Sequence, residues 1–373
     1  MAFDSEVPAP DVASFRTGLR LWLDSHDLTP DPAAEHSLDA QVAQLSRVRA
    51  ALYAAGWMRY GWPAEVGGLG GPAVLRAVLG EEVSARGLAE PGIYSMVEVL
   101  APTMISYAAP PLAAQMVPLL LNGEEQWCQG FSEPGSGSDL ASLTTKAEQR
   151  GSSWVITGQK VWTSLAQYSQ RCVLLTRTAP GHGGITAFFV DMDSPGITVR
   201  PLRTMHGVDE FAEVFFDGVT VPTSRMLGQP GDGWRVAMDL LPYERSTCFW
   251  HRIAYLFNRL DRLTAAATVP DEAALGSVYL SLYTARCRSR ETQRRLGSGA
   301  ALGPETSVDK ILLQAAEQQL YDTARDLLPS VIELSDSPWR AEYLYSRAAT
   351  IYGGTAEIQR NIVARRLLDL GRE

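Results

Sequence analysis

Apolar residues recur at helical spacing along the first part of the chain. Asp11 is placed to cap a helix whose inner face carries Val12, Phe15, Leu19, Trp22 and Leu23. The same spacing continues from Leu38 to a stop near Gly56. Both segments are predicted to be amphipathic helices that bury one face in a bundle.

Three more helical patterns follow, over residues 73–86, 92–108 and 112–121. Pro118 lies in the last of them and is expected to kink or shorten that helix, because proline has no N–H to donate. Residues 1–125 are therefore predicted to form an all-helical domain.

From about Gln126 the apolar period changes to two, which is typical of strands. The predicted strands cover 154–157, 172–176, 185–191, 197–200, 213–216 and 219–221. Gly158 is interpreted as a turn after the first of these strands. Residues 126–230 are predicted to form a small antiparallel β-domain.

The helical period then returns and continues to the end of the chain. The predicted helices cover 234–268, 272–296, 307–328, 338–350 and 355–370. Residues 231–373 are thus predicted to form a C-terminal helical domain. The expected fold class is mostly α with an inserted antiparallel β-domain.

Composition limits the partners that the chain is expected to bind. The 373 residues carry a formal net charge of −9 and no basic stripe, so we expect no nucleic-acid partner. Only 20% of the residues are charged, below the roughly 25% of an average soluble domain, which indicates that part of the surface is hidden in subunit contacts. The only lysines are Lys146, Lys160 and Lys310, which we attribute to coding preference.

The four cysteines lie far apart and form no C-x-x-C motif, so neither a zinc site nor a disulfide framework is expected. The N-terminus is acidic where a signal peptide requires a basic start. No apolar segment reaches the roughly 18 residues that a membrane span requires. We therefore expect a cytoplasmic protein that binds no metal and no membrane.

Two short stretches carry candidate chemistry. Residues 128–139, CQGFSEPGSGSD, place three glycines, three serines and a proline between apolar runs, so their N–H and hydroxyl groups are free to bind phosphate or a polar ring edge. Residues 158–164, GQKVWTS, place Trp162 beside two hydroxyls, an arrangement that suits a flavin or a nucleobase. On pattern alone, a plain turn and a core tryptophan are the commoner explanations.

A third stretch, Gly353-Gly354-Thr355, precedes an amphipathic helix near the C-terminus. Unpaired N–H groups at a helix N-terminus favour a diphosphate or a ligand carbonyl, although on pattern alone an ordinary N-cap at Thr355 is the commoner explanation. The glycine-rich segment 61–72 has no preceding strand and no Gly-Lys-Ser/Thr, so it is predicted to be a loop and not a phosphate site.

The GFSEPGSGSD loop, the QKVWTS stretch, residues 188–233 and the C-terminal IYGGTAEIQR together resemble the acyl-CoA dehydrogenase family. The resemblance covers nearly the whole chain. It implies a helical domain, a β-barrel domain and a C-terminal four-helix bundle. It also implies FAD as cofactor and α,β-desaturation of an acyl thioester as the reaction.

When the family's flavin-binding positions are transferred one by one to this chain, the resemblance implies flavin contacts from the two β-domain stretches and from the C-terminal helical domain. These residues are Gln129, Phe131, Ser132, Ser138, Trp162, Thr163, Ser164, Arg290, Thr355 and Glu357. The assignment of Arg290 is the weakest, because Arg290-Glu291-Thr292-Gln293 lacks the aromatic residue of the family's adenosine motif. Either the adenine is held differently or another subunit supplies part of the site.

Abstraction of a thioester α-proton requires a carboxylate base kept away from water and hydrogen bonds that stabilise the enolate. Many family members carry this glutamate where Gly353 stands here. A smaller branch takes it from an E-R pair after the β-domain, so the resemblance implies Glu244 as the base, with Ser138, Arg245 and Gly353 at the substrate. The alternative is an ordinary surface ion pair, and Pro242 is expected to disturb the helix nearby.

The resemblance also implies partners. We expect an acyl-CoA or acyl-carrier-protein substrate, an electron-transfer flavoprotein as acceptor, and a homodimer or homotetramer. Two alternatives stay open on sequence alone: a flavin oxidase or monooxygenase on the same fold, and a non-catalytic partner subunit of a heteromeric dehydrogenase.

Overall fold

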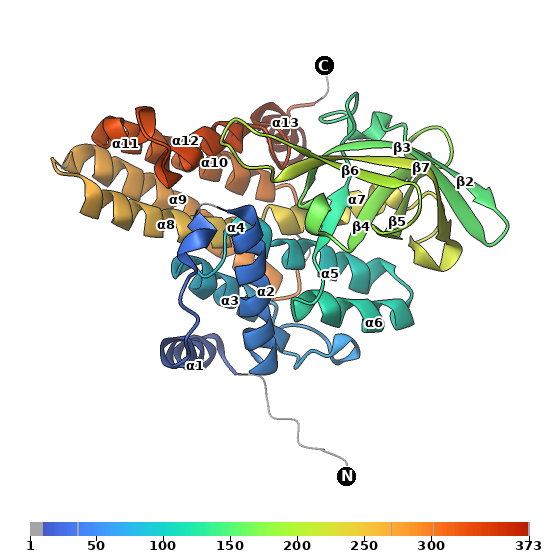
Figure 1. The fold of residues 1–373 in the computed structure, drawn as a ribbon, viewed down its shortest axis with the longest axis horizontal. Helices are drawn as coiled ribbons and strands as arrows, with labels where there is room; N and C mark the ends of the chain where they lie inside the picture. The colour runs from blue at the N-terminus through green and yellow to red at the C-terminus, as the bar shows by residue number, and fades with distance from the viewer. Residues whose placement is uncertain (1–9, 36, 270, 301, 372–373) are drawn as a thin grey trace, which may run out of the picture.

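A computed structural model describes residues 10–35, 37–269, 271–300 and 302–371. Helices, a β-sheet and a second set of helices follow one another along the chain, and the sheet lies at one end of the molecule (Figure 1). The predicted fold class, mostly helical with an inserted sheet, is confirmed.

The N-terminal helices are α1 (Val12–Ser25), α2 (Leu38–Ala54), α3 (Val74–Ala85), α4 (Pro91–Tyr94), α5 (Met96–Tyr107) and α6 (Pro110–Leu121). The predicted cap is confirmed, because the Asp11 carboxylate accepts hydrogen bonds from two backbone N–H groups of α1. Helix α6 continues past Pro118, so this proline does not end it. The single helix predicted over 92–108 is wrong: Glu90 caps a separate first turn, and Ser95 lies between α4 and α5.

The sheet consists of β1 (Trp127–Gly130), β2 (Lys146–Arg150), β3 (Ser153–Ser164), β4 (Arg171–Arg177), β5 (Ile185–Asp191), β6 (Ile197–Leu202), β7 (Phe211–Pro222) and β8 (Met226–Leu227). Its order is β6-β7-β3-β2-β4-β5-β8, with β1 parallel to β4 at one side. The long pairings, β3 with β7 and β4 with β5, are antiparallel. Side chains from six of the strands meet in one apolar core, around which the sheet curves.

The turn predicted at Gly158 is wrong. Strand β3 runs straight through this residue, and its pairing with β7 shifts register there. A Cβ at Gly158 would lie 2.6 Å from the Cα of Thr145, so only glycine fits. The predicted strands 213–216 and 219–221 are likewise joined in β7. A glycine inside a strand often marks a shift in strand register. The sequence pattern alone does not distinguish this shift from a turn.

The C-terminal helices are α7 (Gly233–Glu244), α8 (Thr247–Ala266), α9 (Glu272–Gly297), α10 (Thr306–Leu327), α11 (Pro329–Glu333), α12 (Pro338–Ser346) and α13 (Ala356–Arg366). The single helix predicted over 234–268 is wrong, because Ser246 leaves helical geometry with φ −114° and ψ −85°. The sequence pattern also missed α11, and it extended the last two helices by a few residues. Apolar spacing continues across these breaks, so it does not reveal them.

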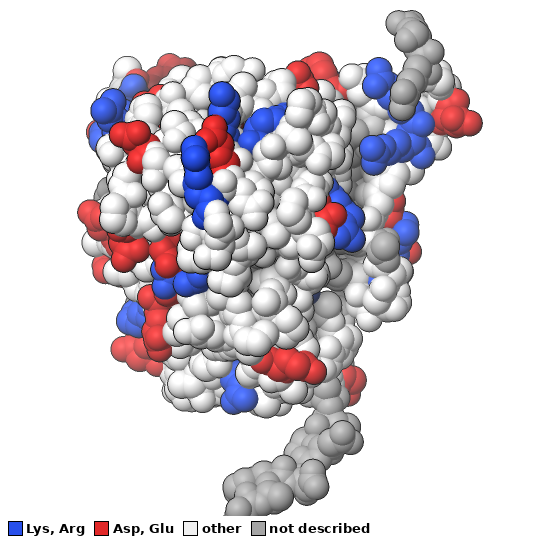
Figure 2. Space-filling model, turned by 90° about the vertical axis from the view of Figure 1, so that its right-hand side faces the viewer, with Lys and Arg blue, Asp and Glu red and all other residues white. Residues whose placement is uncertain are grey.

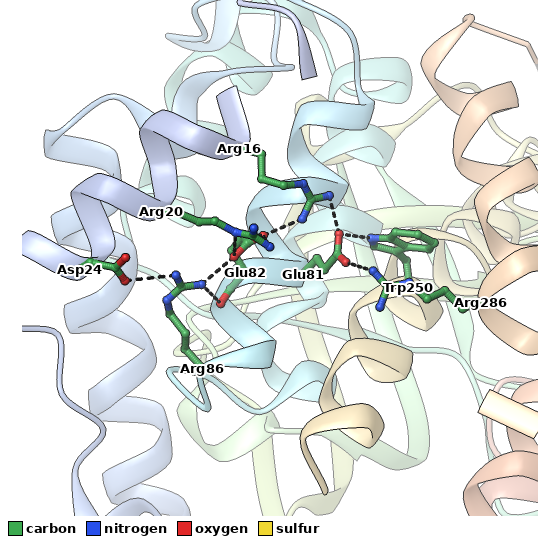
Figure 3. A network of polar contacts seen from close by, with 8 residues as sticks. All are labelled: Arg16, Arg20, Asp24, Glu81, Glu82, Arg86, Trp250 and Arg286. Atoms are coloured by element: carbon green, nitrogen blue, oxygen red, sulfur yellow. Dashed lines mark hydrogen bonds and ion pairs between the residues drawn. The ribbon is translucent and has the colours of Figure 1, made fainter. Parts of the chain in front are cut away.

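Buried carboxylates on α3 connect the N-terminal and C-terminal helices (Figure 3). Glu82 is paired with Arg16, Arg20 and Arg86, while Glu81 accepts from Trp250 Nε1 at 3.2 Å. Burial raises the pKa of Glu82, but hydrogen bonds from the three guanidinium groups outweigh it and lower the pKa below its usual value. Because Trp250 lies on α8, this network positions the start of that helix.

Helix α7 lies in the largest apolar core of the chain. This core combines N-terminal helices, one side of the sheet, and Val236, Ala237 and Leu240 of α7. Helix α7 is therefore held between α5 and the sheet, and residues 241–244 at its end are half-buried. Among the residues that the structure describes, no helix combines the length and the apolarity that crossing a bilayer requires.

Candidate active site

The two candidate stretches of the β-domain lie side by side. Val161 N donates a hydrogen bond to Ser132 O at 2.9 Å, and Lys160 Nζ donates to Phe131 O at 3.1 Å. The glycine and serine loop therefore leaves β1 along the part of β3 that carries Trp162.

A buried ion pair fixes the start of this loop. Glu133 Oε1 accepts from Lys160 Nζ at 2.8 Å, and the lysine side chain is fully buried. The same carboxylate accepts hydrogen bonds from the backbone N–H groups of Thr144 and Thr145, where the loop ends. Burial raises the pKa of Glu133, but the charge of Lys160 and these hydrogen bonds outweigh it and lower the pKa to about 2.

The end of β3 presents an unusual set of groups. Trp162 is 60% exposed and has a φ of 59°, a left-handed backbone conformation that costs a non-glycine residue roughly 1–2 kcal/mol. The neighbouring Thr163 is buried with its hydroxyl unpartnered, and Gln129 Oε1 on β1 is also buried without a partner. An exposed indole beside buried polar atoms that lack partners fits a flat, polar cofactor such as a flavin.

The other predicted flavin residues vary in their surroundings. Ser132 and Ser164 are half-buried beside the same two stretches, Phe131 is buried, and Ser138 is exposed on the loop. Glu357 is exposed on α13, where it pairs with Arg360 at 3.6 Å.

The predicted base lies at a bend between two helices. Glu244 is the last residue of α7, and its carboxylate faces Gly353, where an added Cβ would lie 3.0 Å from Oε1. Arg245 is 8% exposed, and its Nε donates to Gly353 O at 3.2 Å. The structure therefore brings together three of the four residues that the resemblance placed at the base and the substrate, although 108 positions separate Arg245 from Gly353.

Lys310 on α10 completes this group, and the sequence reasoning missed it. Its side chain is fully buried, its Nζ donates to Ala349 O, and it lies 4.3 Å from the centre of the Tyr352 ring. Burial lowers the pKa of Lys310 to about 8, against the opposing charges of Glu317 and Glu244. The rarity of lysine was the available signal, since two of the three lysines are buried next to candidate site residues.

A buried polar cluster continues from Tyr352 away from Glu244. Tyr352 Oη donates to Glu317, whose carboxylate is paired with Arg252 at 2.7 Å. Arg252 also pairs with Glu90 at 2.8 Å, so residues of three helical segments meet here. Burial, reinforced by the charge of Glu90, raises the pKa of Glu210 to about 8 at the edge of the cluster.

The loop between β6 and β7 links this cluster to the end of β3. Leu165 N, directly after β3, donates to Glu210 O at 2.8 Å, and the His206 ring lies 5.2 Å from that of Tyr345 on α12. The strand carrying Trp162 therefore ends near α12, where the ring of Tyr345 lies 5.9 Å from that of Tyr352 in the turn before Gly353. The candidate cofactor stretch and the candidate base belong to one connected region.

Free backbone donors occur next to Glu244. Within the described part of the chain, the N–H groups of Gly353 and Gly354 donate to no protein acceptor. Thr355 does form an ordinary N-cap, because its hydroxyl accepts from Ile358 N at 3.3 Å. The two glycine N–H groups are therefore available to a ligand carbonyl, whereas the threonine hydroxyl is already occupied.

Arg290 does not join the other predicted flavin residues within one chain. It is exposed on α9 and lines a separate pocket of about 210 Å³ with Arg16, Trp250 and Gln293. This pocket lies among α1, α3, α8 and α9, not at the sheet.

Several known proteins are similar to this chain. The family model of the acyl-CoA dehydrogenase middle domain matches residues 128–219, and that of the acyl-CoA dehydrogenase C-terminal domain matches residues 231–368. Acyl-CoA dehydrogenase IpdE1 of Mycobacterium tuberculosis is 38% identical over 97% of this chain and 99% of its own length. Acyl-CoA dehydrogenase FadE34 of the same organism is 35% identical over 92% of this chain, which spans 49% of FadE34. The solved Tcur3481-Tcur3483 steroid ACAD has a TM-score of 0.85 and 25% identity, covering 99% of this chain and 100% of that one.

Proposed function

The chain belongs to the acyl-CoA dehydrogenase family and is an oxidoreductase of the CH–CH bond of acyl-CoA, and on this premise we propose that it is an FAD-dependent dehydrogenase whose base is Glu244. The observation that carries the proposal is the position of Glu244, which faces Gly353 between the side chains of Arg245 and Lys310. Glu244 itself is half-buried, and the side chains of Arg245 and Lys310 beside it are buried.

Proton abstraction is the step assigned to Glu244. The thioester α-carbon lies in the space beside Gly353, where the absence of a side chain leaves the carboxylate accessible. Glu244 takes the α-proton, and the Cα–H electrons move into the enolate of the thioester. The N–H groups of Gly353 and Gly354 are the donors available to the thioester carbonyl, and such donors stabilise the charge that develops on its oxygen.

The same chain supplies the groups that would hold FAD. Trp162 offers its exposed face, while Gln129 Oε1 and the Thr163 hydroxyl are buried polar atoms without protein partners. Ser132 and Ser164 flank these groups, and the pair of Glu133 with Lys160 keeps the loop in place. Bound FAD supplies the acceptor for the hydride that leaves the β-carbon.

A second subunit is proposed to complete the site. Arg290 lines a pocket away from the sheet, so we propose that it contacts the FAD of a neighbouring copy, and we propose the same role for Glu357, which is exposed on α13. The face at the sheet end of the molecule carries few charged side chains over its middle (Figure 2). Such a surface suits a homodimer or homotetramer. An electron-transfer flavoprotein is the proposed electron acceptor.

A heteromeric assembly is the second candidate. FadE34 is about twice as long as this chain, which spans 49% of it, and the name of the solved steroid ACAD combines two components. In this alternative, a different chain of the same fold replaces the second copy. The mass of the flavin-containing complex distinguishes the two assemblies.

Anaerobic titration of the purified protein with acyl thioesters tests the proposed function. We expect a yellow protein whose flavin absorbance bleaches with one class of thioester. A protein that remains colourless after incubation with FAD, alone and with a candidate partner chain, would contradict FAD dependence. Rapid reoxidation of the reduced flavin by air would favour an oxidase.

Replacing Gly353 with alanine is expected to lower kcat by about tenfold to a hundredfold, because the new Cβ would lie 3.0 Å from Glu244 Oε1 and displace the base. Stopped-flow flavin reduction measures this effect. The matched control is Gly299→Ala, because Gly299 has a similar φ of +73° but no atom within 4 Å of the added Cβ. Both variants have the same kind of backbone strain, so equal rates in both would contradict a direct effect on Glu244.

A further inference from the structure

Gln359 is a buried amide that the proposed mechanism does not use. It lies on α13 and is fully buried, and its Nε2 donates to Gly353 O at 2.9 Å and to Gly354 O at 3.4 Å. Its Oε1 is also buried and finds no partner among the described residues. A buried amide with an unpaired oxygen costs stability, so its position requires a reason.

The needs of helix α13 do not supply this reason. A helix N-terminus requires acceptors for its free N–H groups, and the hydroxyl of Thr355 provides one by accepting from Ile358 N. Gln359 does the opposite, because it donates to carbonyl groups that precede the helix. The reversed orientation of the amide would direct Oε1 at two carbonyl oxygens, so the donating orientation is the one that the surroundings permit.

The turn that Gln359 contacts has little conformational preference of its own. Gly353 and Gly354 have φ values of +64° and +88°, and glycine adopts this left-handed region and its alternatives about equally readily. Arg245 Nε donates to the same Gly353 O at 3.2 Å, so one carbonyl accepts from two buried side chains, one after α7 and one on α13. The two donors together fix a peptide unit that glycine alone would leave free to rotate.

Fixing the carbonyl of Gly353 also fixes the N–H of Gly354. The two groups belong to one planar peptide unit, and the described residues contain no cis peptide bond. In a trans peptide the carbonyl and the following N–H point in opposite directions. Because Gly353 O is directed at Arg245 and Gln359, the N–H of Gly354 is directed away from both side chains.

We propose that Gln359 is a positioning residue, which together with Arg245 holds this peptide so that the N–H of Gly354 donates to the carbonyl of the acyl thioester. The inference rests on the proposed function, since it assumes that the thioester binds beside Gly353. Charge develops on the carbonyl oxygen as the α-proton leaves, and a donor stabilises this charge best when its direction is set beforehand. A peptide that rotated freely would have to be ordered in each turnover, which lowers the rate.

Gln359→Met tests the proposal in the flavin-loaded protein, because methionine keeps the length of the side chain and removes the donor. The limiting rate of flavin reduction by an acyl thioester should fall by about tenfold to a hundredfold, since a displaced donor loses transition-state stabilisation. Binding of the α,β-unsaturated thioester, which is the product and is not dehydrogenated again, should change little. Stopped-flow reduction and equilibrium titration measure the two effects.

Gln44→Met is the matched control. Gln44 is also a buried glutamine whose Nε2 donates to two consecutive carbonyl groups, Leu88 O at 2.7 Å and Gly87 O at 3.4 Å. These groups lie on α2 and in the turn after α3, outside the proposed site. Gln44→Met should therefore lose stability in denaturant unfolding, as Gln359→Met does, but reduce flavin at the wild-type rate. Equal losses of rate in the two variants would overturn the proposal.

Infrared spectroscopy provides a readout that a purely structural role would not change. The probe is the α,β-unsaturated thioester, isotope-labelled at its carbonyl carbon and bound to the oxidised flavoprotein. In the wild type and in Gln44→Met, hydrogen bonding should shift the carbonyl stretch to lower frequency than in the free thioester. Gln359→Met should keep less than about half of this shift. The full wild-type shift in folded Gln359→Met would overturn the proposal.

Gln359→Asn tests the same idea if the methionine variant does not fold. Its side chain is one methylene shorter, so an amide on the same helix no longer reaches Gly353 O, and the same losses of rate and of carbonyl shift are expected. A wild-type carbonyl shift in Gln359→Asn would also overturn the proposal.

The wild-type spectrum separates this inference from the function on which it rests. If the bound thioester shows no carbonyl shift in the wild type, the proposed binding beside Gly353 is wrong and the inference falls with it. A shift that is equal in the wild type and in Gln359→Met refutes only the role of Gln359. Glu244→Gln should keep the shift, because the base is not a donor to the carbonyl, so its loss of flavin reduction tests the base separately.

Discussion

Glu244→Gln is expected to lower the rate of flavin reduction by an acyl thioester by about 10²- to 10⁴-fold, because the amide cannot accept the α-proton. The substitution keeps the size of the side chain, so thioester binding and the contact with Gly353 should change little. Anaerobic stopped-flow reduction measures the loss, and equilibrium binding of a non-reactive thioether analogue measures the affinity.

Glu333→Gln is the matched control for this loss. Glu333 is the exposed last residue of α11, which lies at the end of the molecule opposite the sheet (Figure 1). Its substitution should leave flavin reduction unchanged. Prompt reduction in Glu244→Gln, at the rate of this control, would remove Glu244 from the mechanism.

Lys160→Met is expected to lower the free energy of unfolding by about 3–5 kcal/mol, because it leaves the buried carboxylate of Glu133 without its cation. The same change should weaken FAD binding, since Glu133 joins both ends of the glycine and serine loop. Denaturant unfolding of the apoprotein and fluorescence titration with FAD measure the two effects separately.

Two further variants make this prediction specific. Lys146→Met should change stability by less than about 0.5 kcal/mol, because an exposed lysine is replaced. The double variant Lys160→Met with Glu133→Gln should be more stable than Lys160→Met alone, because it no longer buries an unpaired charge. Wild-type stability in Lys160→Met would contradict the proposed role of the pair.

The same pair predicts how stability depends on pH. The pKa of Glu133 is about 2 in the folded protein and is near its usual 4.5 when the chain unfolds. The unfolded chain therefore binds the proton at higher pH, so this contribution is complete above pH 4.5 and is lost as the pH falls toward 2. In Lys160→Met this dependence should be weaker.

The sequence determined the types of most elements and the proximity of the two β-domain stretches. A helix that buries one face repeats its apolar residues about every 3.6 positions, and a strand that buries one face repeats them every second position. The helices and strands could therefore be predicted from the spacing of apolar residues. The motifs around Ser132 and Trp162 adjoin one another because the loop that leaves β1 runs along the end of β3, where Val161 N donates to Ser132 O. Glu244 could be proposed as the base only because its E-R pair resembles one branch of the family.

The tertiary structure alone decided what surrounds that glutamate. The break after α7 lies within a continuous helical pattern, so no local signal marked it. Lys310 lies far from both Glu244 and Gly353 in sequence, and only the packing of α10 against the end of α7 and the turn before α13 brings it beside them. Arg290 was predicted from a motif that is only partly present, and the packing of α9 directs it to another pocket. Periodicity encodes which side of an element is buried, whereas contacts between distant elements depend on how those buried sides fit together.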